Sequence, residues 1–148
     1  LATATSAVLY AKDVSVAKLR FVVDAKLVSN TSTDAAYELL AGGSFGTSPS
    51  YHHCNWEPIA RRMLLKTYDG TSVTTIGDKI AAEPAGYDPN AGVTLELVID
   101  GAVISCKVHE VPGAELSGAI SVPLTGSGIA FKTWKASAIY DNVFVYQL

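Results

Sequence analysis

The sequence has 148 residues, of which 49% are hydrophobic and 17% are charged, and its formal net charge is −3 at pH 7. This length suits one domain with a substantial core, and this composition excludes a disordered chain. Lysine and arginine are scattered and no apolar run reaches the roughly 20 residues of a membrane-spanning helix, which argues against nucleic-acid binding and against a membrane span.

Short apolar or alternating runs separated by turn residues recur along the chain, and sustained helical periodicity is missing. Runs of this kind that are rich in Val, Ile, Thr, Tyr and Phe predict strands. The predicted strands are Ala7–Ala11, Leu19–Val28, Ala36–Ala41, Met63–Tyr68, Val73–Ala81, Val93–Ile99, Val103–Val108, Ala119–Pro123, Gly128–Trp134 and Ile139–Tyr146. Their number and spacing predict an all-β protein, a two-sheet antiparallel sandwich.

Two stretches in the first half are harder to interpret. Asp34–Leu40 is compatible with a short helix, since Gly42 and Gly43 follow it and glycine often ends a helix. The β-rich runs on either side favour a strand there. From Gly42 to Asn55 the sequence shows no clear alternation, so we expect this stretch to be the longest loop.

The clearest local element is a β-hairpin. Apolar residues alternate along Val93–Ile99 and again along Val103–Val108. Asp100-Gly101 between the two runs predicts a tight type I′ turn, because aspartate and glycine adopt the left-handed backbone that this turn requires.

The chain contains two cysteines, Cys54 and Cys106. Cys106 alternates with Ile104 and Val108, which places it on the core face of a strand. Free cysteine is among the most buried residue types, so we interpret both as buried, inert thiols. A single Cys54–Cys106 bridge is the alternative.

Three segments of the second half carry a family resemblance, in the family's own order. They are the hairpin Val93–Val108, the segment Gly126–Trp134 with a short apolar strand ending in threonine and an aromatic, and Ala138–Val145 with its Asp-Asn-Val motif. Together they resemble the concanavalin A-like lectin/glucanase superfamily, especially its laminin G-like jelly rolls. The resemblance implies a jelly-roll β-sandwich, but a fold does not by itself define a function.

We expect residues 1–148 to form one such domain. The chain starts at Leu1 and lacks the pattern of a signal peptide, so we expect either a removed N-terminus or a place within a larger protein or assembly.

The Asp-Asn-Val motif has a structural consequence of its own. Tyr140, Val143 and Val145 cannot all face inward if the strand alternates strictly. A bulge at Asp141-Asn142 would bring them to the same face, and the carboxylate of Asp141 would then accept backbone N–H bonds within the bulge.

Catalysis is not expected from the sequence. A glycosidase needs two carboxylates placed on either side of the scissile bond. Retaining glucanases of the resembling superfamily carry a Glu-x-Asp-x-x-Glu strand, and this sequence contains no such run. Glu96 and Asp100 flank a turn, where a solvated surface is the ordinary explanation. We therefore predict that the chain is not an enzyme.

The segment Tyr51–Trp56 combines aromatic residues, two histidines, a cysteine and an asparagine. Adjacent side chains rarely bind one metal together and His109 is remote in sequence, so a packed aromatic loop is favoured over a zinc site. Aromatic side chains also stack on the apolar faces of sugar rings. The candidate ligand-binding residues are Tyr51, His53, Trp56, Tyr87 and Trp134, although either tryptophan could instead fill the core.

Calcium is permitted by the resemblance without being required. Ca²⁺ takes six to eight oxygen ligands, and no calcium-loop spacing occurs. The candidate ligands are Asp69, Asp78, Asp88, Asn90 and Asp141, with Asp88, Asn90 and Asp141 preferred. Capping of turns by hydrogen bonds is the favoured role for these residues, and no other metal or cofactor is expected.

The sequence therefore favours a non-catalytic, lectin-like binding domain that serves carbohydrate recognition or adhesion on a secreted or surface-displayed protein. Its partner would be a glycan or another protein. The alternative is a structural or assembly domain of a virus particle, such as a decoration, knob or tail-fibre jelly roll, with possible homo-oligomers.

Overall fold

The structure is a computed structural model that describes residues 18–45, 48–124 and 126–148. These residues form ten strands: β1 (Lys18–Asn30), β2 (Ala36–Ser44), β3 (Ser50–Glu57), β4 (Arg62–Tyr68), β5 (Val73–Ile80), β6 (Val93–Asp100), β7 (Val103–Val108), β8 (Glu115–Ala119), β9 (Gly128–Trp134) and β10 (Ala136–Gln147). The described ranges contain no helix, and hence no helix with the length and apolar character to cross a membrane.

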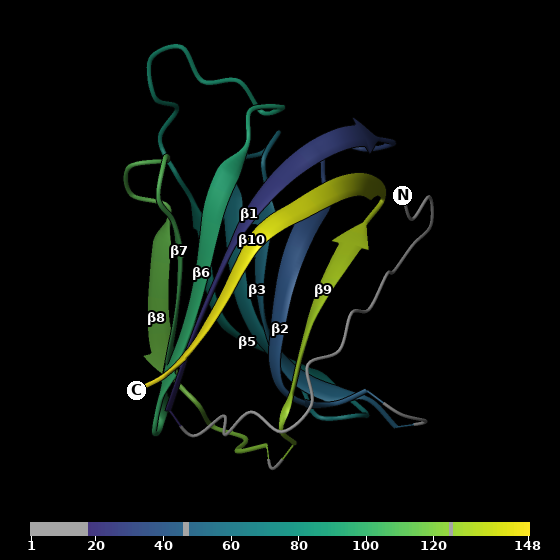
Figure 1. The fold of residues 1–148 in the computed structure, drawn as a ribbon, viewed down its shortest axis with the longest axis vertical. Coiled ribbons are helices and arrows are strands. Elements are labelled where there is room, and N and C mark those ends of the chain that lie inside the picture. Colours follow the sequence, from purple (N-terminus) through teal and green to yellow (C-terminus); the bar gives the residue numbers. More distant parts are fainter. Residues whose placement is uncertain (1–17, 46–47, 125) are drawn as a thin grey trace.

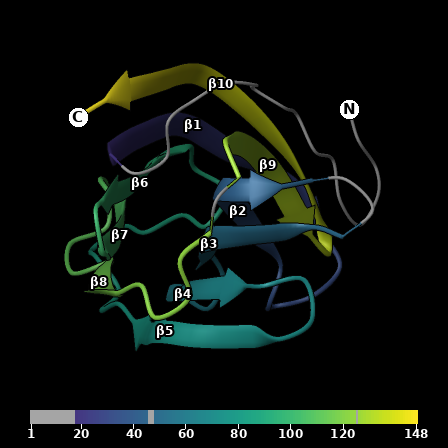
Figure 2. The same ribbon diagram turned by 90° about the horizontal axis from the view of Figure 1, so that it is seen from below.

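The strands form two antiparallel five-stranded sheets that pack face to face (Figure 1, Figure 2). The first, here called the β1 sheet, has the order β10-β1-β6-β7-β8, and the second, the β3 sheet, has the order β5-β4-β3-β2-β9. At the sides of the sandwich β5 contacts β8 and β9 contacts β10. The all-β sandwich predicted from the sequence is confirmed.

The core lies between the sheets because apolar residues alternate along most strands and share one face. On β1, for example, Leu19, Phe21 and Val23 are fully buried while the residues between them are partly exposed. The ring centroids of Phe21 and Phe131 lie 5.3 Å apart across the interface. Each large side chain buried in this way stabilises the fold by about 1.5–3 kcal/mol.

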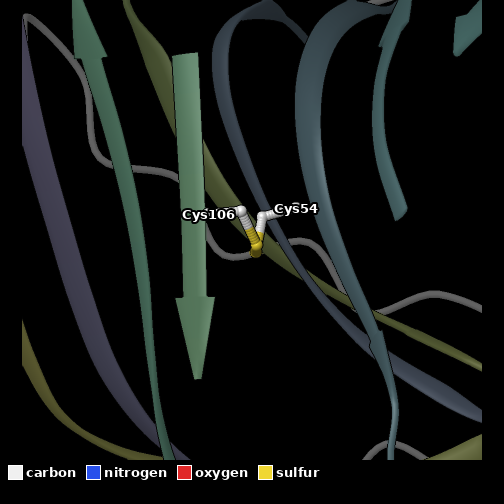
Figure 3. Close-up of a disulfide and its surroundings, with 2 residues drawn as sticks. All are labelled: Cys54 and Cys106. Atoms are coloured by element: carbon white, nitrogen blue, oxygen red, sulfur yellow. A yellow bond between two sulfur atoms is a disulfide. The ribbon is translucent and has the colours of Figure 1, made fainter. Parts of the chain in front are cut away.

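A disulfide joins the two sheets through the middle of this core (Figure 3). Cys54 of β3 and Cys106 of β7 are bonded, and their Cα atoms lie 5.6 Å apart. The interpretation of both residues as inert thiols is therefore wrong, whereas their burial is confirmed. The two cysteines are inward-facing residues on facing strands of opposite sheets, a proximity that alternation within either strand alone does not reveal.

Most predicted strands match, with two errors among the described residues. Asp34–Leu40 contributes a strand and no helix, as favoured. The expected loop from Gly42 to Asn55 instead contains most of β3, a strand whose last six residues are all buried. Burial on both faces removes the alternation of polar and apolar residues by which a half-exposed strand is recognised. The predicted strand Ala119–Pro123 is also wrong, because β8 ends at Ala119, and Ala7–Ala11 lies outside the described residues.

The β6–β7 hairpin is confirmed, but its turn differs from the predicted one. Asp100 pairs with Val103, so the two loop residues are Gly101 and Ala102. Gly101 has a φ of 61°, whereas Ala102 is not in the left-handed region. A single left-handed residue at the first loop position is typical of a type II′ turn rather than type I′.

The bulge expected in β10 is confirmed. Val22 pairs with Phe144 and Asp24 with Asp141, so two residues of β10 lie opposite one residue of β1. Asn142 takes a φ of 48°, and the carboxylate of Asp141 accepts a hydrogen bond from the backbone N–H of Asn142 at 2.8 Å. The bulge does not turn the following apolar residues inward, since Val143 and Val145 remain 45% and 37% exposed.

Candidate functional site

The outer surface of the β3 sheet brings together aromatic and charged side chains from all five strands. Because successive residues of a strand point to opposite sides, the residues between the core positions face outward. We call this outward set the polar face: Lys132 and Trp134 of β9, Glu38 of β2, Tyr51, His53, Asn55 and Glu57 of β3, Arg62, Lys66 and Tyr68 of β4, and Asp78 of β5.

The register of the strands arranges this face in rows that run across the sheet. Glu38 lies between Lys132 on one side and Asn55 on the other. In the neighbouring rows His53 pairs with Lys66 and Tyr51 pairs with Tyr68. Residues that are distant in sequence thereby become neighbours on one surface.

Glu38 is the centre of a buried polar cluster. Asn55 Nδ2 donates a hydrogen bond to Glu38 Oε1 at 3.0 Å, while Lys132 Nζ and His53 Nδ1 lie 3.4 Å and 3.5 Å from Glu38 Oε2. Burial alone would raise the pKa of Glu38. The close approach of His53, the charge of Lys132 and the hydrogen bond from Asn55 outweigh it and lower the pKa to about 2. Glu38 is therefore a fixed carboxylate over the whole physiological range of pH.

This cluster has hydrogen-bonding capacity that the described part of the chain does not use. Oε2 of Glu38, both ring nitrogens of His53 and Oδ1 of Asn55 are buried, and none of them completes a hydrogen bond there. Buried polar atoms in folded proteins nearly always have a partner. The cluster is therefore suited to groups that donate and accept hydrogen bonds at once, such as hydroxyls.

Aromatic rings lie at both ends of the polar face. At one end the ring of Tyr51 lies 5.6 Å from that of His53 in an edge-on arrangement, and 5.5 Å from that of Tyr68. At the other end Trp134 is 42% exposed, with the ammonium groups of Lys132 and Lys135 at 5.7 Å and 5.5 Å from its ring centroid. These cations hold the exposed indole in place by cation–π attraction.

Of the five ligand-binding candidates, Tyr51, His53 and Trp134 lie on the polar face. Trp56 points the other way from β3 and is fully buried in the core, where no surface ligand can reach it. Tyr87 packs against the core, and its hydroxyl donates a hydrogen bond to the backbone oxygen of Pro58 at 2.6 Å. Trp56 and Tyr87 therefore do not belong to this surface.

Sequence reasoning missed several members of the face, and above all its central residue. Glu38 interrupts an otherwise apolar strand, which is a signal of a buried charge that needs partners. Its partners Asn55 and Lys132 could not be named, because they depend on the pairing of β2 with β3 and β9.

The adjacent histidines point to opposite sides of β3. His52 is buried on the inward side, where its Nδ1 lies 2.8 Å from Thr67 Oγ1, and burial lowers its pKa to about 4. His53 belongs to the polar face. Among the described residues no three His, Cys, Asp or Glu side chains are grouped in a way that could hold a metal ion.

The calcium candidates are occupied in separate places. The carboxylate of Asp88 accepts a hydrogen bond from the backbone N–H of Asn90 at 2.9 Å. Asp69 caps the β4–β5 loop in the same manner, and Asp78 binds Arg62. Asp141 serves the β10 bulge.

No family model matches the sequence, and no curated protein matches it either. Solved structures do resemble the fold. The carbohydrate-binding module CBM66 of Bacillus subtilis has a TM-score of 0.70 at 13% identity, over 88% of this chain and 76% of its own. A human galectin-16 variant has a TM-score of 0.69 at 10% identity, over 95% of both chains. A GH43 protein of Bacillus licheniformis has a TM-score of 0.58 at 12% identity, over 89% of this chain but 28% of its own.

At such low identities these likenesses concern the fold alone. Together with the two-sheet architecture they show a concanavalin A-like jelly-roll sandwich, as the resemblance implied.

Proposed function

We propose that the chain is a non-catalytic, lectin-like domain that binds carbohydrate on the polar face. The observation that carries this proposal is the combination on one sheet surface of accessible aromatic rings with a buried, fixed hydrogen-bonding cluster. Sugar-binding sites require both, because a pyranose ring has an apolar face and a rim of hydroxyl groups.

Each part of the face has a role in this proposal. Trp134 offers an exposed ring on which an apolar sugar face can stack. Glu38, Asn55 and His53 are buried and fix the position of Lys132, whose ammonium group is partly exposed and donates to ligand hydroxyl groups. Because the cluster is already desolvated and held by neighbouring strands, little ordering is needed when a ligand binds.

The structural neighbours support the same reading. One is named as a carbohydrate-binding module, and another from chicken liver as a homodimeric agglutinin. The finer similarity to laminin G-like domains rests on the three segments of the second half. A secreted or surface-displayed location, and with it a role in adhesion, is supported by the Cys54–Cys106 disulfide, since such bonds persist in oxidising compartments.

A glycan screen of the whole chain, run with calcium and again with a chelator, tests the proposal. We expect at least one saccharide to bind, and Trp134→Ala to weaken its affinity about three- to tenfold, or roughly 0.7–1.4 kcal/mol. Phe144→Ala, an exposed aromatic on the outer face of the β1 sheet, is the matched control and should leave the affinity unchanged. A folded sample that binds no saccharide would refute the proposal for the glycans tested.

One observation favours the alternative role in assembly. In the C-terminal half of β10 four consecutive residues, Val143 to Tyr146, are 37–51% exposed and apolar or aromatic. Exposed apolar patches mark association surfaces. Self-association in sedimentation, with no saccharide bound, would favour a structural domain such as that of a virus particle over a lectin.

A further inference from the structure

A pocket of about 410 Å³ opens where the polar face meets the loops after β1 and β3. Its lining includes Asp34 from the β1–β2 connection, Glu57 at the end of β3, Arg62 at the start of β4 and Asp78 on β5. Three carboxyl groups and one guanidinium thus surround the same space, and the pairing among them decides what the pocket can bind.

Two of the three carboxylates already have a cation. Arg62 binds Asp78 in a bidentate manner, with Nε donating to Oδ1 at 2.9 Å and a terminal nitrogen donating to Oδ2 at 2.6 Å. Lys135 Nζ donates to Asp34 Oδ2 at 2.8 Å. A guanidinium group has few positions at which a carboxylate can bind in a bidentate manner, and Asp78 occupies one of those of Arg62.

Glu57 is the carboxyl group without a partner. It is only 6% exposed, and within the described ranges its side chain makes no hydrogen bond and no ion pair. Burial, as the largest cause, and the charges of Asp34 and Asp78 raise its pKa, against the opposing charges of Arg62 and Lys66. Neither carboxyl oxygen of Glu57 is among the buried polar atoms that lack a partner, so both are open to solvent and a cation that arrives from outside can contact them.

The position of Glu57 on the polar face indicates how a ligand bound there can bring a cation to this carboxyl group. Ala36 of β2 pairs with Trp134, and the next residue, Tyr37, pairs with Trp56, which directly precedes Glu57 at the end of β3. Adjacent strands are about 4.8 Å apart, so the indole and the carboxyl lie on strands roughly 10 Å apart. The ion pair of Lys135 and Asp34 lies beside the same indole, with Lys135 Nζ 5.5 Å from its ring centroid. A sugar ring that contacts Trp134 can therefore direct a substituent toward Glu57.

We propose that this pocket binds the protonated amino group of an amino sugar, with the carboxylate of Glu57 as its acceptor. This inference rests on the proposed carbohydrate binding and specifies its ligand class. An ammonium group supplies the missing positive charge and up to three hydrogen-bond donors, whereas a hydroxyl or an acetylated nitrogen supplies no charge.

The test compares two probes on the whole chain by calorimetry: the trisaccharide of glucosamine and its fully N-acetylated counterpart. We expect the free-amine probe to bind about tenfold more tightly or better, since hydrogen bonds to charged groups are the strong ones. Glu57→Gln, which keeps the size but not the charge, should remove this preference, so that the two probes bind with similar affinity. Glu115→Gln, on an exposed position of β8, should change neither affinity.

If Glu57→Gln does not fold, the pH dependence of the unaltered chain serves instead. The preference for the free-amine probe should grow as pH rises through the raised pKa of Glu57, because only the carboxylate attracts the ammonium. An equal preference below the ordinary glutamate pKa of 4.5 and at a mildly acid pH, where the amine is still protonated, would overturn the proposal.

The remaining outcomes separate the two proposals. Saccharides that bind without a free-amine preference would overturn the Glu57 pocket and leave carbohydrate binding intact. The absence of any saccharide binding would overturn both. Binding of Nα-acetyl-lysine methylamide as tight as that of the free-amine trisaccharide would overturn the assignment to a sugar and favour a lysine side chain of a protein.

Discussion

The charged groups at the centre of the polar face are buried, whereas those on the outer face of the β1 sheet, like the Arg62–Asp78 pair at the edge of the polar face, are partly exposed. On the polar face of the β3 sheet, Glu38 is almost completely buried among its partners. On the outer face of the β1 sheet, the ion pair of Lys18 and Asp100 is 61% exposed on both sides, and Arg20 in its pair with Glu96 is 44% exposed. Desolvated charges must be held in fixed positions, whereas solvated ones need not be. Both faces are built on the same alternation, so burial is what makes one of them a candidate site.

The difference between the two faces is tested most directly by removing one charge from each face and comparing the loss of stability. We expect Glu38→Ala to lower the free energy of unfolding by about 3–5 kcal/mol, because it leaves Lys132 without its buried counter-charge. Asp100→Ala on the other face should cost no more than about 1 kcal/mol. Urea unfolding of both variants measures the difference, and equal losses would contradict the contrast between the faces.

The disulfide offers the next largest effect, since it connects the strand at the centre of the polar face to the opposite sheet. Replacing both cysteines by serine should lower the free energy of unfolding by about 2–5 kcal/mol. Unfolding of the variant, compared with the oxidised unaltered chain, measures the loss, and the unaltered chain in reductant is the control. A variant as stable as the unaltered chain would mean that the packing of the two sheets suffices without the bond.

Acid titration distinguishes the two glutamates of the polar face. The pKa of Glu38 is lowered, so its contribution to stability is present above the ordinary glutamate pKa of 4.5 and is lost as pH falls toward about 2. The pKa of Glu57 is raised, so its contribution has the opposite sign and is lost as pH rises through that pKa. Relative to the unaltered chain, Glu38→Gln should lose stability at neutral pH and Glu57→Gln should gain it. Unfolding curves of both variants at several pH values measure these changes, and a change of stability opposite to either expected direction would contradict the corresponding pKa shift.

The smallest effect is expected on the outer face of the β1 sheet. Arg20 donates to Glu96 at 3.0 Å, and His109 also binds Glu96, at 2.7 Å. Arg20→Met should therefore cost at most about 1 kcal/mol, since the pair is partly solvated and Glu96 keeps a second partner. A double-mutant cycle with Glu96→Gln isolates the pair, and a coupling as large as that of Glu38 would remove the distinction between the faces.

What the sequence could predict follows from the same difference in burial. Strands with one solvated face, such as Val93–Ile99, show the alternation by which they are recognised. The strand β3 was missed because its residues are buried on both faces. Tyr51, His53 and Trp134 were identified by residue type alone. Glu38 and Asn55 needed the register of two strands, and the disulfide needed the packing of two sheets, which a single sequence does not supply.

The position of Cys54 between His53 and Asn55 has a consequence for the dynamics of the polar face. The two residues that point outward stand on a segment whose inward residue is covalently tied to the opposite sheet. Local opening of this segment requires separation of the sheets, so its backbone amides should exchange with solvent only through global unfolding. The polar face would then present the same arrangement of atoms to every ligand. The selectivity of the face among ligands would come from the shape and charge already present rather than from a rearrangement of the protein.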